Sequence, residues 1–263
     1  MKILITGSEG FIGKHLVNLL KEKHEIYGFD RNENKDLNIL GDIAEAFIEF
    51  KPYIVIHLAS NISNDINECR DDVIALLNLL AFCKEFEVKK FIFTSSAAVY
   101  GDSYPKIIPI NPYGIAKLQC EQWCEYYAKE YGINIIIMRL GNVYGVNGKG
   151  VINQFITQLK NNQPLTIFGD GKQLRNYVYI DSIIDIVNRY VEFKEWANFE
   201  VFDVATQEVH SLFDILYNIN NIIKKPIEIN FLPKQKEIEN SNIIGYNCKI
   251  KLQEGIEKLW NEM

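Results

Sequence analysis

The sequence predicts an α/β protein built on a doubly wound parallel sheet, with a small C-terminal lobe. Short runs of apolar and β-branched residues recur along the first half of the chain, and the middle of each run is hydrophobic without alternation. Such runs are typical of parallel strands that are covered on both faces. The strands are expected at Lys2–Thr6, Glu25–Phe29, Ile54–Leu58, Lys90–Thr94 and Asn134–Arg139.

The segments between these strands have the apolar spacing of amphipathic helices. Helices are expected at Phe11–Lys23, Ile43–Phe50, Asp71–Phe86 and Tyr113–Tyr131. Strands that alternate with helices in this way predict a parallel sheet with helices on both of its faces.

The regular alternation declines after Gly141, where glycines and a proline separate shorter elements. We therefore expect a first domain over residues 1–145, to which part of 176–204 returns. The remaining residues, 146–263, should form mainly a smaller lobe that covers a substrate. A final amphipathic helix is expected over Gly255–Met263.

Composition narrows the function. The chain has 28 Lys+Arg against 34 Asp+Glu, a net charge of −6, which argues against a nucleic-acid partner. No apolar run approaches the ~18 residues of a membrane span, so neither a membrane partner nor a signal peptide is expected, and the location should be cytoplasmic. The five cysteines are odd in number and spread out, which favours neither disulfides nor a metal site. Cys120 and Cys124 are expected to be buried apolar residues.

A glycine-rich turn follows the first predicted strand and opens the first predicted helix, with the sequence Gly7-Ser-Glu-Gly10-Phe-Ile-Gly13. Glycines at this place let the backbone approach a pyrophosphate closely, and the helix N-terminus then faces its charge. A glycine triplet alone is a weak signal, but this position predicts a Rossmann-like dinucleotide site.

The end of the second predicted strand indicates which dinucleotide binds. Asp30 follows Gly7 by 23 positions, close to the ~20-residue separation of a carboxylate that binds the adenosine ribose. A carboxylate repels a 2′-phosphate, so NAD is favoured over NADP. Arg31 leaves NADP open, because a guanidinium beside the acid can host that phosphate.

A tyrosine and a lysine stand four positions apart in Tyr113-Gly-Ile-Ala-Lys117, on one face of the predicted helix. An ammonium beside a phenol favours the ionised form, which makes Tyr113 a candidate general acid/base. Upstream, Thr94, Ser95 and Ser96 follow a buried strand, so their hydroxyls should lie at the carboxyl edge of the sheet, where doubly wound folds bind ligands.

Taken in this order, the glycine turn, the Ser96 segment and the Tyr113/Lys117 pair resemble the extended short-chain dehydrogenase/reductase family. The likeness is to its NAD-dependent nucleotide-sugar epimerases, reductases and dehydratases, above all to UDP-glucose 4-epimerases. It implies that Tyr113 is the acid/base at a sugar hydroxyl, that Ser96 bonds the same oxygen and that Lys117 holds the nicotinamide ribose.

Further segments match this family. Asp36-Leu37 resembles a family pair that lies beside the adenine of the cofactor. Leu58-Ala59-Ser60 resembles a family segment whose backbone lines the cofactor. With the residues above, the implied cofactor site is Gly7, Gly10, Phe11, Ile12, Gly13, Asp30, Arg31, Asp36, Leu37, Leu58, Ala59, Ser60, Thr94, Tyr113, Lys117 and Leu140.

The resemblance also implies a nucleotide-diphosphate sugar as partner. The residues that would bind this sugar nucleotide are Ser96, Asn142, Phe168 and Arg175. Asn142 lies in the segment Arg139-Leu-Gly-Asn-Val-Tyr-Gly, and the last two follow it in the chain. Arg175 offers a planar fork of donors suited to phosphate oxygens. A homodimer through the helices near Asp71–Phe86 and Tyr113–Tyr131 is likewise implied.

The chain departs from the family pattern at several positions. Asp72 stands where asparagine is common, and Asn176 replaces the usual aspartate after the arginine. Lys234 and Lys236 are the nearest cations where the family has a further arginine on the diphosphate. Ala97 and Ala98 occupy the positions at which related sugar dehydratases carry an Asp-Glu pair.

We therefore expect hydride transfer at C4 of a nucleotide-linked hexose, by a 4-epimerase or a 4-keto reductase. Two alternatives stay open at this point: a carbonyl reductase of the same fold that acts on a non-nucleotide substrate, and a non-catalytic NAD-binding redox sensor. Asn142 with Arg175 argues against the first, and the Ser96/Tyr113/Lys117 set argues against the second.

Overall fold

The computed structural model describes residues 1–233, 243 and 245–263, which form two compact units. The first unit consists of Met1–Gly101, Ile107–Arg139 and Ile184–Phe202. The second consists of Asp102–Lys106, Leu140–Ile183 and the described residues from Asp203 to Met263.

The first unit contains the parallel sheet that the sequence predicts. Its strands run in the order β9-β5-β4-β3-β1-β2, and β1 lies between β2 and β3 in parallel register. Their bounds are β1 (Lys2–Thr6), β2 (Glu25–Phe29), β3 (Ile54–His57), β4 (Lys90–Ser96), β5 (Asn134–Leu140) and β9 (Phe199–Ala205). All five predicted strands are confirmed, but β4 extends two residues further than predicted, so that it ends at Ser96.

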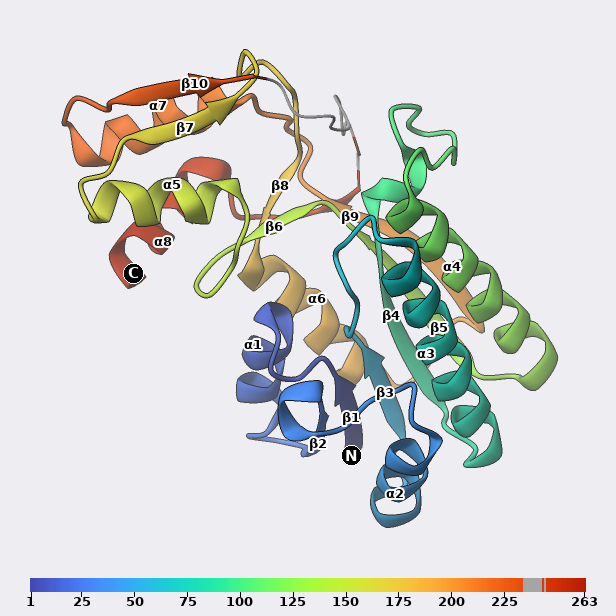
Figure 1. The fold of residues 1–263 in the computed structure, drawn as a ribbon. Coiled ribbons are helices and arrows are strands. Elements are labelled where there is room, and N and C mark those ends of the chain that lie inside the picture. The colour runs from blue at the N-terminus through green and yellow to red at the C-terminus, as the bar shows by residue number, and fades with distance from the viewer. Residues whose placement is uncertain (234–242, 244) are drawn as a thin grey trace. The chain divides into compact units, whose positions relative to one another are not determined.

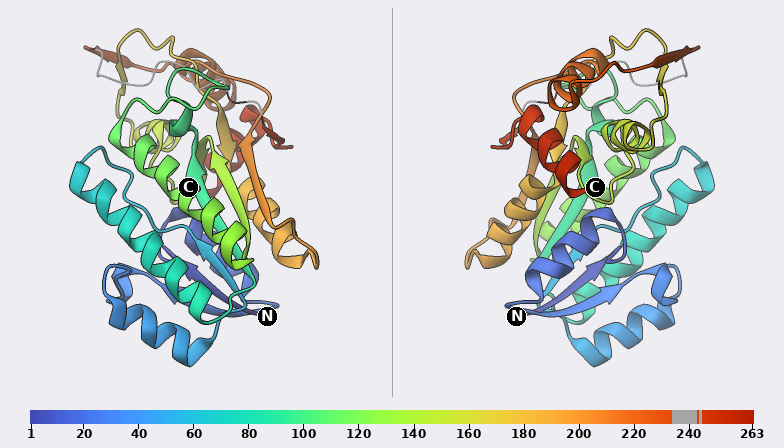
Figure 2. Two further views of the ribbon diagram at one scale, coloured as in Figure 1. Left: turned by 90° about the vertical axis from the view of Figure 1, so that its right-hand side faces the viewer. Right: turned by 90° about the vertical axis from the view of Figure 1, so that its left-hand side faces the viewer.

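Helices cover both faces of this sheet (Figures 1 and 2). They are α1 (Phe11–Leu20), α2 (Leu40–Phe50), α3 (Ile66–Glu85), α4 (Pro112–Tyr131) and α6 (Ile180–Glu192), which enters this unit at Ile184. In the left view of Figure 2, α2, α3 and α4 lie in front of the sheet, and in the right view α1 does. The doubly wound arrangement is therefore confirmed.

Helix α3 starts five residues earlier than the sequence predicts, since the prediction placed its first residue at Asp71. The helix begins at Ile66, because the side chain of Asp65 accepts hydrogen bonds from the backbone N–H groups of Asn67 and Glu68. An aspartate that caps the first turn stabilises a helix start even where the turn itself is polar.

The core of the first unit lies between the sheet and the helices α2, α3 and α4. Strand residues such as Val55 and Phe91 and helix residues such as Phe47 and Leu76 are all fully buried there. Cys120 and Cys124 belong to the same cluster, as expected, and burial raises the pKa of the Cys120 thiol to about 12. These cysteines therefore act as small apolar core residues.

The second unit contains two short parallel pairs, β6 (Asn142–Tyr144) with β8 (Tyr177–Tyr179), and β7 (Leu165–Phe168) with β10 (Ile229–Leu232). Figure 1 shows β7 and β10 side by side near α7. In this unit β11 (Tyr246–Asn247) also pairs with Val204 and Ala205. Its helices are α5 (Val151–Lys160), α7 (Leu212–Ile223) and α8 (Leu252–Glu262), so the predicted final helix starts three residues early.

Among the residues that the structure describes, no helix combines the length and apolar character needed to cross a membrane.

Candidate functional site

Lys117 is the buried centre of the candidate site. Its side chain is held by the carbonyl oxygen of Thr94, which accepts a hydrogen bond of 3.0 Å from Nζ at the end of β4. The ammonium lies 5.8 Å from the ring centroid of Tyr113, one turn earlier on α4. The sheet edge therefore fixes the lysine, and the helix spacing brings it to the tyrosine, as predicted.

Tyr113 lies in the first turn of α4. Asn111 caps this helix by accepting from the N–H of Gly114 at 2.8 Å, and Pro112 occupies the first helical position. Proline and a capping asparagine both favour a helix start. The sequence thus places the half-buried phenol at a well-defined helix terminus rather than on a loop.

Ser96 ends β4 and begins a short 3-10 turn, η2 (Ala97–Tyr100). Its hydroxyl oxygen accepts from the N–H of Ala98 at 3.2 Å, which leaves the hydroxyl proton available to a ligand. This turn packs tightly on α4, because a Cβ added at Gly114 would lie 2.4 Å from the carbonyl oxygen of Ala98. Ser96 and Tyr113 therefore belong to two segments in direct contact.

A narrow pocket lies between α4, α3 and the strands β3 and β4. It is lined by His57, Ala59, Asp72, Phe93, Tyr113, Ala116, Lys117 and Cys120. His57 donates or accepts a 2.7 Å hydrogen bond with the hydroxyl of Thr6, and burial lowers its pKa to about 3, helped by the charge of Lys117. This histidine is therefore a neutral structural residue.

Asp72, on α3, faces this pocket and organises the loop after β3. Its carboxylate accepts from the hydroxyl of Ser60 at 2.6 Å and from the backbone N–H and side-chain amide of Asn61 at 2.9 and 2.8 Å. Burial raises the pKa of Asp72, although these hydrogen bonds and the charge of Lys117 lower it. The sequence showed the unusual aspartate but not its contacts.

A buried ion pair holds the Ser96 segment and was missed by the sequence analysis. Glu121 accepts from Arg139 in bidentate fashion, at 2.9 and 2.6 Å, and from the hydroxyl of Ser95 at 2.5 Å. Arg139 also donates to the hydroxyl of Tyr100 at 2.7 Å. The only signal in the sequence was spacing, since Glu121 follows Tyr113 and Lys117 by two turns and one turn of the same helix.

The glycine turn has the close backbone approach that a dinucleotide site requires. Gly7 has φ +69°, and a Cβ at Gly13 would lie 2.0 Å from the carbonyl oxygen of Gly7. Helix α1 has no side-chain cap, so the N–H groups of its first turn, at Phe11 and Ile12, are not bonded to a capping side chain. This segment therefore fits a pyrophosphate at a helix N-terminus.

Asp30 links this turn to the end of β2. Its carboxylate accepts from the N–H of Glu9 at 3.0 Å and from the N–H of Asn32 at 3.0 Å. Arg31 points to Asp36 instead, and donates to its carboxylate at 3.0 Å. Because Asp36 already pairs with this guanidinium, the arrangement around Asp30 fits NAD better than a 2′-phosphate.

The remaining cofactor candidates lie on the same unit, except for Leu140. Leu37 is buried, and its carbonyl oxygen accepts from the side chain of Asn78 at 3.0 Å. The N–H groups of Leu58 and Ala59 lie 3.2 and 3.3 Å from the hydroxyl of Thr6. The structure therefore brings the glycine turn, β1 and the loop after β3 to one edge of the sheet.

The three predicted sugar-nucleotide ligands other than Ser96 belong to the second unit. Asn142 donates from its side chain to the carbonyl oxygen of Asn176 at 3.1 Å, and Arg175 precedes Asn176 and pairs through its backbone with His210. Phe168 ends β7 and is 37% exposed. Asn142 and Arg175 thus adjoin the same residue, while Lys234 and Lys236 lie outside the described residues.

Asn176 explains one departure from the family pattern. It is fully buried, and its amide group donates to the carbonyl oxygen of Thr206 at 2.6 Å while its oxygen accepts from the N–H of Thr206 at 2.9 Å. An ionised aspartate has no donor for the first of these bonds. The asparagine therefore has a structural role here.

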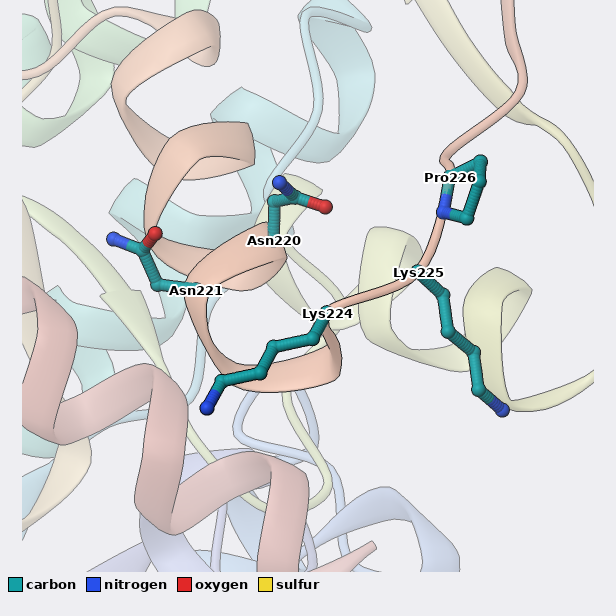
Figure 3. A pocket seen from close by; sticks show the side chains of 5 residues that line it. All are labelled: Asn220, Asn221, Lys224, Lys225 and Pro226. Carbon is teal, nitrogen blue, oxygen red and sulfur yellow. The ribbon is translucent and has the colours of Figure 1, made fainter.

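A second hollow lies at the end of α7, lined by Asn220, Asn221, Lys224, Lys225 and Pro226 (Figure 3). In Figure 3 the two lysine side chains extend away from each other. Because these residues do not converge on one point, this hollow is not a candidate catalytic site.

Comparisons with known proteins show the family to which the chain belongs. The sequence model of the NAD dependent epimerase/dehydratase family matches residues 3–205. A protein of Methanocaldococcus jannaschii that carries the provisional name UDP-glucose 4-epimerase is 30% identical over 99% of this chain and 98% of its own length. A dTDP-D-glucose 4,6-dehydratase of Dictyostelium discoideum is 32% identical over 84% of this chain and 62% of its own.

Two solved structures of epimerases have a fold similar to that of this chain. The UDP-glucose 4-epimerase of Thermotoga maritima, with UDP-glucose, has a TM-score of 0.91 at 27% identity, over 99% of this chain and 98% of that one. The UDP-glucose 4-epimerase of Thermus thermophilus, in complex with NAD, has a TM-score of 0.89 at 26% identity, with the same coverage.

Proposed function

Because the chain belongs to the NAD dependent epimerase/dehydratase family, we propose that it transfers a hydride at C4 of a nucleotide-linked hexose, as a 4-epimerase or a 4-keto reductase. The observation that supports this most is the triad of Ser96, Tyr113 and Lys117. Thr94 holds the lysine at 3.0 Å, the lysine lies beside the Tyr113 ring, and the Ser96 turn packs on the same helix.

NAD is the cofactor. The glycine turn would hold the pyrophosphate of NAD, and Asp30 would bind its adenosine ribose. The backbone of Leu58–Ser60 would line the cofactor near the reacting centre. When bound, NAD accepts the hydride that leaves C4 and, in an epimerase, returns it. Leu140, Asp36 and Leu37 complete the site that we propose.

Tyr113 moves the proton in this reaction. As C4 loses its hydride, the proton of the C4 hydroxyl passes to the phenolate oxygen of Tyr113, and the C4–O bond becomes a carbonyl. Lys117, whose ammonium lies 5.8 Å from the ring centroid of Tyr113, would hold the nicotinamide ribose beside it. Ser96 donates a hydrogen bond to the same substrate oxygen, and its position depends on the packing of Ala98 against Gly114.

The substrate's diphosphate would be bound by Asn142 and Arg175, and Phe168 would contact the base. The guanidinium of Arg175 suits phosphate oxygens because its donors lie in one plane. A carbonyl reductase for small substrates has no need of these residues, and a redox sensor has no need of Tyr113 with Lys117.

Ala97 and Ala98 argue against a 4,6-dehydratase, although one relative carries that name. Elimination of water across C5 and C6 needs one group to remove a carbon-bound proton and another to protonate the leaving hydroxyl. Neither methyl side chain can do this, so we expect oxidation or reduction at C4 alone.

The test is to incubate the protein with NAD and UDP-, GDP-, CDP- and dTDP-hexoses in D₂O, and to analyse the products by NMR and mass spectrometry. We expect interconversion at C4, without deuterium at C3 or C5. A parallel incubation with NADH and 4-keto sugars would reveal a reductase. Loss of water, or deuterium at C5, would contradict the proposal.

A further inference from the structure

Asp72 places a carboxylate in the pocket that contains Tyr113 and Lys117. Its oxygens accept hydrogen bonds from Ser60 and Asn61, and it lines the same pocket as Lys117, whose charge acts on it. An asparagine would keep only one acceptor oxygen for these bonds, whereas the aspartate has two and adds a negative charge. The charge is the property that would act differently on the two redox forms of a cofactor bound nearby.

We propose that Asp72 is a charge-setting residue of this site, which makes it bind oxidised NAD⁺ more tightly relative to NADH and so suits it to a 4-epimerase rather than a 4-keto reductase. This inference rests on the proposed function, because hydride transfer at Tyr113 requires the nicotinamide ring to lie beside this pocket, next to Tyr113 and Lys117. The proposal concerns the relative affinity of the protein for NAD⁺ and NADH.

The nicotinamide ring is positively charged in NAD⁺ and neutral in NADH, while Lys117 contributes one positive charge to the pocket in both states. Without Asp72, the oxidised ring would meet only this positive charge, which disfavours it. The carboxylate of Asp72 offsets the charge of the lysine, so the oxidised ring can lie beside the pocket at lower electrostatic cost.

This preference matters for the direction of the reaction. An epimerase begins by oxidising C4 and must hold NAD⁺ between turnovers, whereas a 4-keto reductase begins by taking NADH from solution. A pocket that favours the oxidised ring keeps the protein ready for the first of these reactions.

The other titratable groups that face Asp72 do not account for such a preference. On α4 these are Lys117, Tyr113 and Cys120, on β3 His57, and on α3 Cys69. Burial keeps His57 neutral, with a pKa of about 3, and raises the pKa values of Cys69 and Cys120. A change in cofactor preference in weakly acidic solution is therefore assigned to Asp72.

The experiment compares wild-type protein, Asp72→Asn and Asp71→Asn as a matched control. Asp71 is the adjacent residue on α3, pairs with Arg70 at 3.1 Å at the surface, and is not among the residues that line the pocket. The dissociation constants of NAD⁺ and NADH are measured for each by calorimetry, after circular dichroism has confirmed that each variant is folded.

For Asp72→Asn we expect the affinity ratio of NAD⁺ to NADH to fall about tenfold, an effect typical of one charge at short range in a partly screened pocket. Asp71→Asn should leave the ratio within about twofold. An unchanged ratio in Asp72→Asn, an equal loss of affinity for both forms, or the same change in both variants would overturn the proposal.

A second measurement follows the affinity ratio of NAD⁺ to NADH as the pH is lowered. In wild-type protein the preference for NAD⁺ should decline as the pH falls and Asp72 gains a proton, at a higher pH than for an ordinary carboxyl group because burial raises its pKa. The ratio in Asp72→Asn should stay flat over the same range, and a wild-type ratio that is equally flat would contradict the proposal. Neither measurement requires a sugar, so failure of the proposed C4 reaction would be recognised separately.

Discussion

Glu121 and Arg139 form a bidentate ion pair inside the first unit, with N–O distances of 2.9 and 2.6 Å. The side chains are only 6% and 13% exposed. Through Ser95 and Tyr100, the pair holds residues on both sides of the segment Ser96–Val99. A buried ion pair contributes little net stability when intact, but it is costly to break.

This arrangement predicts strongly non-additive mutations. Glu121→Leu leaves the guanidinium of Arg139 buried without its carboxylate and should lower the free energy of unfolding by about 3–5 kcal/mol. The double variant Glu121→Leu/Arg139→Met removes both charges and should be more stable than the single variant. Urea unfolding measures both; a double variant that is no more stable than Glu121→Leu would contradict the prediction.

Tyr113→Phe should abolish turnover while it leaves NAD binding nearly intact. Loss of a positioned acid/base typically costs ~10²–10⁴-fold in rate. Ser96→Ala should cost less, because only one hydrogen bond to the reacting oxygen is lost. Steady-state rates on an accepted sugar nucleotide, with NAD affinity as the control, check this; wild-type activity in Tyr113→Phe would refute the mechanism.

Asp30→Ala should reduce the preference for NAD over NADP. The carboxylate accepts from Glu9 and Asn32 and would repel a 2′-phosphate, while Arg31 is paired with Asp36. Arg31→Ala is the matched variant and should leave the preference largely as it is. Fluorescence titration with both cofactors measures the effect. If the wild-type protein binds NADP more tightly, the interpretation of Asp30 is wrong.

We propose that the protein is a homodimer through α3 and α4. On α4, Trp123, Tyr126 and Tyr131 are 40%, 47% and 40% exposed, and Tyr126 makes edge-to-face contacts with both of the others. Aromatic residues are enriched at protein interfaces. Tyr126→Glu should therefore yield monomers in analytical ultracentrifugation.

Tyr217→Glu, on α7, is the control for this substitution, since Tyr217 is 69% exposed in the second unit. It should leave the dimer intact. A wild-type protein that sediments as a monomer at micromolar concentration would count against the proposed dimer.

Features that depend on a local sequence pattern could be predicted without the structure. The strands β1 to β5, the glycine turn and the spacing of Tyr113 and Lys117 were all predicted, because hydrophobic periodicity and helical spacing act over a few residues. The start of α3 was missed for the same reason. Its first turn, Ile66-Asn-Glu-Cys-Arg70, is largely polar and depends on the Asp65 cap rather than on apolar spacing.

Contacts between polar groups that are distant in the sequence could not be predicted and became visible only in the folded chain. Asp72 meets Ser60 and Asn61, and Glu121 meets Arg139, because the order of the strands brings the ends of β3, β4 and β5 beside α3 and α4. No local pattern encodes such pairings, since each polar side chain could equally be solvated at the surface. Burial removes that option, and each buried group must then find a partner within the fold.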